Sequence, residues 1–327
     1  MDNLPFVGVI NDNTNYREDK KELITKAIEI TDNKLDALNY IATAILHETG
    51  ATAEFTLVIN IPANTIVDIE LSIISDDVLG YYVCWGDGTI NHNINTHTYN
   101  VGKEYIIRFF GLGITGFGLE GKYNMYLTKV LSFGQLGSCF TSLDYAFDGS
   151  INLISVPDYL PSTITTLEYT FNQCYMFNQY LPWDTSNIIS MKSTFGYCRE
   201  FNQNLKWDTR NVINFEDTFY WCSKFNQKLE WDIRNAITTD SMFWGCIEFN
   251  QELDWEFENV INMNYMFNNC IKFNKQLNWD CSNVKTTISM FHNCINLEYD
   301  VNINIPNIEN NDNMFKNCNR LIHRLFL

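Results

Sequence analysis

Hydrophobic and polar residues recur along most of the chain with a period of 24 residues. The tripeptide Phe-Asn-Gln begins at Phe177 and returns at 24-residue steps until Phe249, and two other series keep the same step. The first is a Phe-x-x-Cys series, with the phenylalanines Phe171, Phe195, Phe219, Phe243, Phe267, Phe291 and Phe315 and the cysteines Cys174, Cys198, Cys222, Cys246, Cys270, Cys294 and Cys318. The second is a Trp series of Trp183, Trp207, Trp231, Trp255 and Trp279. Such a period indicates repeats that stack around a shared core, because one short unit cannot bury its own apolar face.

Each repeat contains two patterns. Apolar residues alternate with polar ones over 177–183, which is typical of a short strand. Over 188–198 they are spaced by three and four residues, which favours a short helix or 3₁₀ turns. Residues 184–187 between them have turn chemistry. One strand and one turn-like segment per unit predict a leucine-rich-repeat solenoid over 131–327.

The chain before the repeats divides into two parts. Residues 16–48 within a segment 1–50 carry a heptad seam of apolar side chains, which predicts helix. One interpretation is a short coiled coil that joins copies of the chain, and the other is two helices divided at Thr31-Asp32 that pack on the rest of the chain. The candidate oligomerisation residues are Ile24, Ile28, Leu35, Leu38 and Ile45.

Residues 51–130 alternate with period two, as half-buried strands do, over 55–63 and 66–74. Asp87-Gly88 predicts a hairpin turn. A small β-sandwich is therefore expected here. The predicted fold class for the whole chain is mainly β with short helices: an N-terminal helical segment, this sandwich and the solenoid.

Two stretches resemble known families. The series Trp85-Gly86-Asp87-Gly88, His97-Thr98-Tyr99 and Gly102 is similar to the PKD-like β-sandwich, although the tryptophan stands one residue closer to the glycine than that family has it. The repeat is similar to BspA-like leucine-rich repeats, whose residues are matched here by Met266, Phe267, Cys270, Phe273, Leu277, Trp279, Asp280, Ser282, Asn283 and Val284. Units of that family usually have one residue more between Leu and Trp. The resemblance implies a non-enzymatic protein of bacterial or protist surfaces, or of the large DNA viruses of protists.

The net charge of the chain limits the classes of partner that it can bind. The net charge of -17 argues against nucleic acid and anionic membranes, since both require a basic surface. No run of residues is long and apolar enough to cross a bilayer, and the start of the sequence lacks the features of a signal peptide. No membrane insertion is expected. Location is left open between the virion or cell surface that the resemblance implies and the cytoplasm.

The polar series have structural explanations. One cysteine per repeat without any Cys-x-x-Cys pair favours buried free thiols over disulfides or metal ligands. Asn and Gln at the same place in successive repeats are expected to hydrogen-bond along the stack. The acidic residue after each Trp either caps its turn or binds calcium, and calcium would need more oxygen ligands than are in register.

The chain carries no phosphate-binding loop, zinc-protease motif or nucleophile elbow, and no cofactor is expected. The sequence therefore predicts recognition of a protein or a glycan. The partner is another protein, an identical chain or a component of a particle. The alternative is a structural component of a virus particle or surface layer, assembled through the N-terminal helix; an enzyme hidden in 51–130 is the third hypothesis. Exposed residues that differ between repeats form the candidate interaction surface: Lys206, Lys228, Glu230, Glu252 and Asp254.

Overall fold

The computed structural model describes residues 55–75, 80–111, 114–134, 140–299 and 301–321. The segment 1–50, with the five candidate oligomerisation residues, lies outside them. The strands are β1 (Phe55–Asn60), β2 (Val67–Glu70), β3 (Ile73–Ser75), β4 (Tyr82–Cys84), β5 (Ile90–His92), β6 (Thr96–Tyr99), β7 (Glu104–Phe110), β8 (Ile114–Phe117), β9 (Leu127–Phe133), β10 (Leu277–Asp280) and β11 (Val301–Asn304).

The N-terminal part contains one five-stranded sheet, in the order β5-β4-β7-β1-β9, and two small two-stranded sheets, β2-β6 and β3-β8. All its named strand pairs are antiparallel. Strand β7 also alternates, and its Tyr105, Ile107 and Phe109 side chains are buried in the core. The turn predicted at Asp87-Gly88 joins β4 to β5, and Asp87 accepts a hydrogen bond from the N–H of Thr89 (2.9 Å).

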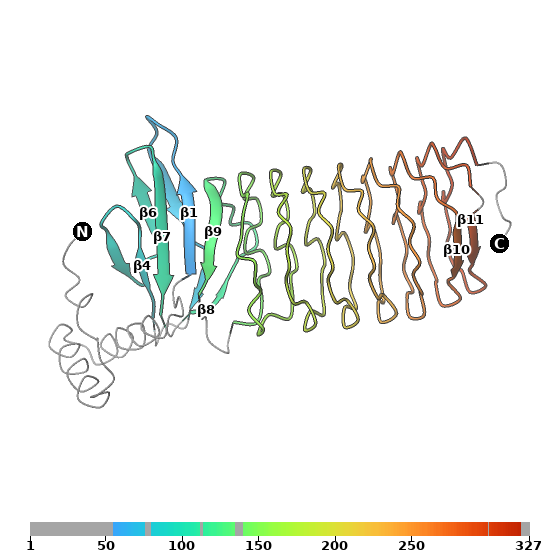
Figure 1. Ribbon diagram of the computed structural model, residues 1–327, viewed down its shortest axis with the longest axis horizontal. Coiled ribbons are helices and arrows are strands. Elements are labelled where there is room, and N and C mark those ends of the chain that lie inside the picture. The colour runs from blue at the N-terminus through green and yellow to red at the C-terminus, as the bar shows by residue number, and fades with distance from the viewer. Residues whose placement is uncertain (1–54, 76–79, 112–113, 135–139, 300, 322–327) are drawn as a thin grey trace, which may run out of the picture.

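The rest of the described chain forms a row of 24-residue coils, which we call the stack. Isolated parallel bridges join residues 24 apart, beginning with Ser142 to Thr166 and ending with Thr286 to Asn310. The coils follow one another in chain order, as the colours of Figure 1 show. Strand β9 connects the two parts, because it pairs with β1 and also forms a bridge between Lys129 and Ser155.

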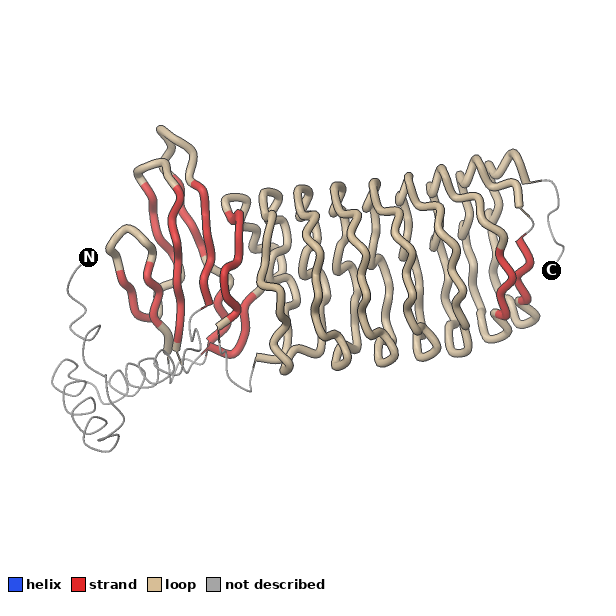
Figure 2. Tube along the Cα trace, viewed as in Figure 1, coloured by secondary structure: helices blue, strands red, loops and turns tan. Residues whose placement is uncertain are grey.

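The predicted fold class is wrong. The described residues contain no helix, and the N-terminal part forms several small separate sheets instead of a simple sandwich. Within the stack, strands occur only at β10 and β11, and the other coils consist of turns and extended loops (Figure 2). The expected leucine-rich-repeat solenoid, with a strand and a short helix or 3₁₀ turns in every repeat, is therefore not the architecture observed.

The expected short helix fails because its backbone groups find partners in the next coil. The N–H groups of Met191 and Phe195 donate to carbonyls of Asn214 and Thr218, both at 2.9 Å. A helix would use these N–H groups within its own segment. Ser193 and Tyr197 also have positive φ angles of 49° and 58°, which interrupt a right-handed helix. The result is a series of tight turns with apolar residues at helix-like spacing.

The expected strands are mostly absent because side chains replace the backbone ladder. The Oδ1 atom of Asn178 accepts the backbone N–H of Asn202 (2.9 Å) and the side-chain amide of Gln203 (3.1 Å). The same arrangement links Asn202 with Asn226 and Gln227 in the following coil. The predicted amide ladder of the Phe-Asn-Gln tripeptides is therefore confirmed. It supplies the partners that adjacent strands would otherwise provide.

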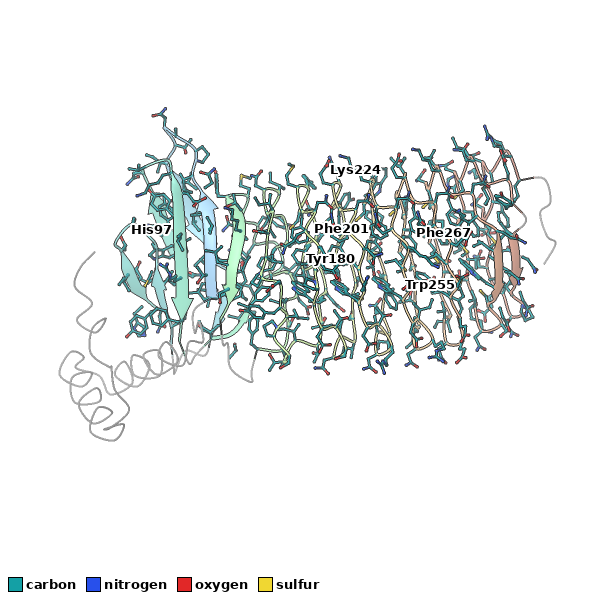
Figure 3. The ribbon with its side chains drawn as sticks, viewed as in Figure 1. His97, Tyr180, Phe201, Lys224, Trp255 and Phe267 are labelled. Atoms are coloured by element: carbon teal, nitrogen blue, oxygen red, sulfur yellow. The ribbon has the colours of Figure 1, made fainter. Side chains whose placement is uncertain are left out.

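Aromatic rings and thiols fill the interior of the stack. Phe201 and Phe267 lie inside it and Lys224 lies at its edge (Figure 3). Equivalent rings stack nearly parallel, as Phe171 and Phe195 do at 5.5 Å. The seven series cysteines are buried thiols, as predicted, and each donates a hydrogen bond to a phenylalanine carbonyl of the preceding coil.

Candidate functional site

The five residues chosen from the sequence are exposed and lie on one side of the stack. They occupy the extended segment between the buried Phe and Trp of three successive coils. Lys228 lies 3.8 Å from Asp254, and Glu252 lies 4.0 Å from Lys275. Their exposure follows from alternation, because Leu229 turns inward between Lys228 and Glu230. Their number per coil is small, and exposed ion pairs contribute little binding energy.

The turn that follows this extended segment is stabilised by the acidic residue after each Trp. Asp208 accepts the backbone N–H of Arg210 at 3.3 Å, and its second oxygen accepts from the Arg210 guanidinium at 2.7 Å. These hydrogen bonds lower the pKa of Asp208, the guanidinium contributing most. Asp232 and Arg234 repeat the arrangement one coil later. Turn capping is thus confirmed as the role of these carboxylates.

A second surface was missed by the sequence analysis. It is a cluster of aromatic side chains on the turn segments of four successive coils, which we call the aromatic patch: Tyr197, Tyr220, Trp221, Trp244 and Tyr265. Tyr197 packs edge-on against Tyr220, with ring centres 5.1 Å apart, and Tyr220 packs in the same way against Trp244 at 5.4 Å. Trp244 then stacks on Tyr265 at 4.9 Å. These four rings form one connected series across the four coils.

Glycine makes room for the most exposed ring of the patch. Trp221 is 36% exposed, and its backbone N–H donates to the carbonyl of Trp244 in the next coil (2.6 Å). A Cβ atom at Gly245 would lie 2.7 Å from the Trp221 indole, so this ring lies against the glycine backbone. Gly245 also has a φ of 75°, which a side chain would strain. The indole is thus held in place by the coil that follows it.

A carboxyl group with unusual acidity lies on the same turn segments. Asp217 is half-buried and no side-chain hydrogen bond to it is found within the described residues. Burial, followed by the neighbouring charges of Glu216 and Asp240, raises its pKa to about 7. The Lys192 ammonium opposes this shift. Within the patch, the indole N–H of Trp244 is buried and has no hydrogen-bond partner among the described residues.

The patch escaped the sequence analysis because its residues break the repeat. The positions after the core Phe hold Gly196 and Tyr197 in one coil, and then Tyr220 and Trp221 in the next. The periodic series contain only residues that recur, so aromatic residues at variable positions do not belong to any of them. An available signal was the run of Tyr and Trp at non-recurring positions, since such residues are enriched in binding surfaces.

His97 of β6 makes aromatic and polar contacts within the N-terminal part. His97 stacks on Trp85 (4.9 Å) and its Nε2 lies 2.7 Å from Asp87. Tyr99 lies beside it and donates its hydroxyl to the carbonyl of Trp85 at 2.6 Å. No group of three or more His, Cys, Asp or Glu side chains is placed to hold a metal ion in the part of the chain that the structure describes.

Comparison with known proteins gives one match. A family model described as "Mycoplasma protein of unknown function, DUF285" matches residues 141–254 and 229–325, which together make up more than half of the chain and most of the stack. No curated protein and no solved structure matches it. Within the described residues, no helix has the length and apolar character needed to cross a membrane.

Proposed function

The chain belongs to the DUF285 family, and we propose that its stack is a non-enzymatic recognition surface for another protein. The aromatic patch carries this proposal. Tyr and Trp are the residues most enriched at the energetic centres of protein interfaces, because each buries a large area at low entropic cost. Here four of them adjoin in series on a scaffold whose other positions are largely repetitive, and Trp221 lies against Gly245 on the same turn segments.

Charge indicates which partner fits. Glu216, Asp217 and Asp240 occupy the same turn segments as the patch, and the whole chain has a net charge of -17. An acidic protein attracts basic partners and orients them as they approach. Arg and Lys side chains also bind favourably over the faces of Trp and Tyr rings. We therefore propose a protein partner that presents Arg or Lys beside apolar residues.

Location and closer kinship are part of the proposal. We infer a relation to BspA-like surface proteins from the repeat residues around Phe267 and Trp279, and a PKD-like module from the series that contains Trp85 and Tyr99. A surface or virion location and a role in adhesion accord with such kinship. Assembly through the N-terminal segment stays a prediction, because residues 1–54 lie outside the described chain.

The test uses immobilised peptides that differ only in their content of Arg, Lys and aromatic residues, with a glycan array run in parallel. The full chain is compared with Trp221→Ala and Tyr197→Ala. Tyr180→Ala is the matched control, since Tyr180 is 46% exposed and lies outside the patch. We expect the wild type and the control to retain basic aromatic-containing peptides, and each patch variant to lose tenfold or more in affinity, about 1.4 kcal/mol.

Two results would contradict the proposal. One is retention of no peptide by the wild type, and the other is equal retention by the wild type and both patch variants. Binding on the glycan array that depends on Trp221 would replace the protein partner with a carbohydrate. Unfolding curves of each variant exclude loss of structure as the cause.

A further inference from the structure

One carboxyl group beside the aromatic patch lacks a partner. The N–H of Tyr220, a ring of the patch, donates to the backbone carbonyl of Asp217 (2.9 Å), so both residues lie on one turn. Burial, then Tyr197, and then the charge of Asp217 raise the pKa of Tyr220, so the carboxylate lies within electrostatic reach of this ring. Within the residues that the structure describes, the Asp217 side chain has no hydrogen bond or ion pair.

The charged groups next to Asp217 already have partners. Lys192 lies 3.0 Å from Glu216 and forms an ion pair with it. Asp240 accepts a hydrogen bond from the Ser241 hydroxyl at 2.6 Å. Lys192 therefore acts on Asp217 only through its charge, without a hydrogen bond. In the described part of this segment, one carboxylate is left without a counter-ion.

Small side chains lie on both sides of Asp217 along the stack. Side chains at this place in the coil lie over one another, as the rings of Tyr145 and Tyr169 do with centres 4.7 Å apart. The equivalent residues in the coils before and after Asp217 are Ser193 and Ser241, which are buried. Neither is long enough to cover the half-buried carboxyl group as a ring would.

Glycine leaves a further gap beside this carboxyl group. Elsewhere in the patch, Trp244 stacks on Tyr265, which lies 21 positions further along the chain. The residue 21 positions before Asp217 is Gly196, so no side chain occupies the equivalent place. The ring next to this glycine in sequence is that of Tyr197, a member of the patch. The carboxylate is thus open to a group that approaches over the patch.

A single carboxylate beside aromatic rings suits an organic cation better than a metal ion. Calcium takes about six to eight oxygen ligands, and no set of three or more acidic, His or Cys side chains is placed to hold a metal among the described residues. An ammonium or guanidinium group pairs with one carboxylate and also binds over aromatic faces. The buried indole N–H of Trp244, which has no partner in the described chain, needs an acceptor, and peptide carbonyls are acceptors. Together these groups match a basic side chain on a peptide segment.

We propose that Asp217 is the anchor of the aromatic patch, the counter-ion that pairs with one Arg or Lys side chain of the partner protein. The proposal rests on the recognition proposed for the stack and adds the residue that selects the cation. Burial, then the charges of Glu216 and Asp240, raise the pKa of Asp217 to about 7, and Lys192 opposes them only in part. Pairing requires the ionised carboxylate, so the affinity should rise about fivefold or more between about pH 6 and about pH 8.

Calorimetry on the full chain tests the anchor with two probes. One is a His-free peptide that carries one Arg between two Phe residues, and the other has citrulline, a neutral isostere, in place of the Arg. At about pH 8 the wild type should bind the Arg peptide tenfold or more tighter than the citrulline peptide, about 1.4 kcal/mol. Asp217→Asn should bind both alike and lose the dependence on pH. Asp254→Asn, which removes an exposed carboxylate outside the patch, should behave as the wild type.

Further variants separate the anchor from the recognition itself. Asp217→Glu restores a carboxylate and should regain the preference for Arg, which a merely structural defect of Asp217→Asn would not explain. If Trp221→Ala abolishes binding while Asp217→Asn keeps both the Arg preference and the dependence on pH, the anchor is wrong and the recognition stands. If the wild type binds neither peptide, both proposals fail. Unfolding curves of each variant establish that it is folded.

Discussion

Truncation of one core ring, Phe225→Ala, tests whether the coils share a continuous core. The Phe225 side chain is fully buried. Its ring centre lies 4.1 Å from that of Phe219 in its own coil. It also lies 6.1 Å from Phe201 and 6.0 Å from Phe249, in the coils on either side. The substitution therefore opens a cavity that touches three coils.

The loss of stability has two sources. Burial of a phenylalanine side chain is worth about 1.5–3 kcal/mol, and the unfilled cavity adds to this because stacked rings cannot easily collapse into it. Truncations of this kind usually cost about 3–5 kcal/mol. We expect the upper half of that range, since three close ring pairs are lost together and such pairs contribute roughly 0.5–1.5 kcal/mol each.

Chemical denaturation followed by tryptophan fluorescence measures the effect. Because coils are stabilised mainly by their neighbours, the variant should also unfold in two separate transitions, one on each side of the damaged coil. Tyr180→Ala removes an exposed aromatic side chain from the stack and should cost less than about 1 kcal/mol. A loss below about 1 kcal/mol for Phe225→Ala, or equal losses for the two variants, would refute a shared core.

Two further expectations concern groups inside or near the stack. The seven series cysteines should react with a thiol reagent only after denaturation, because all are buried and burial raises the pKa of six of them, Cys198 among them, above the ordinary value; fast labelling of several thiols in native buffer, or disulfides among them in non-reducing mass mapping, would contradict this. The pKa of Asp217 is about 7 in the folded state against an ordinary 3.8. Between these pH values the folded state therefore binds more protons than the unfolded state. The contribution of Asp217 to the free energy of unfolding falls as pH rises from about 4 to about 7. Asp217→Asn should flatten this fall and stabilise the protein above pH 7 relative to the wild type, while Asp254→Asn, at an exposed site, should change little; identical pH profiles for Asp217→Asn and the wild type would show that Asp217 titrates normally.

Much of the stack's interior could be read from the sequence. A residue that returns every 24 positions meets its equivalents in neighbouring coils, so the Phe, Trp and Cys series had to be core and the Asn series had to be a ladder. Asn202 and Asn226 show this for the polar series. The N-terminal strand β7 was equally readable, because Tyr105 and Phe109 mark its inner face.

Secondary structure within the coil was not readable in the same way. Spacing by three and four residues around Phe195 is shared by a helix and by a series of tight turns. The choice depended on whether N–H groups bond within the coil or to carbonyls such as that of Thr218 in the next one. A pattern of apolar residues holds no information on that competition.

The candidate surfaces show the same division. Exposure of Lys228 and Glu230 followed from simple alternation around Leu229. The contact of Tyr220 with Trp244 joins equivalent positions 24 residues apart, but it was overlooked because the other repeats hold Asp, Asn, Gly, His or Lys there and no aromatic series is visible.

The sequence by itself determined the period, the core series and the ladders, because each depends only on identical residues meeting at one step. The tertiary structure alone decided how the backbone of each coil is hydrogen-bonded and which varied residues adjoin. Those outcomes depend largely on contacts between coils: Trp221 lies against Gly245, and burial, then Glu216 beside it and Asp240 of the next coil, raise the pKa of Asp217. These contacts join residues 23 or 24 apart whose identities change from repeat to repeat, so they leave no periodic trace in the chain.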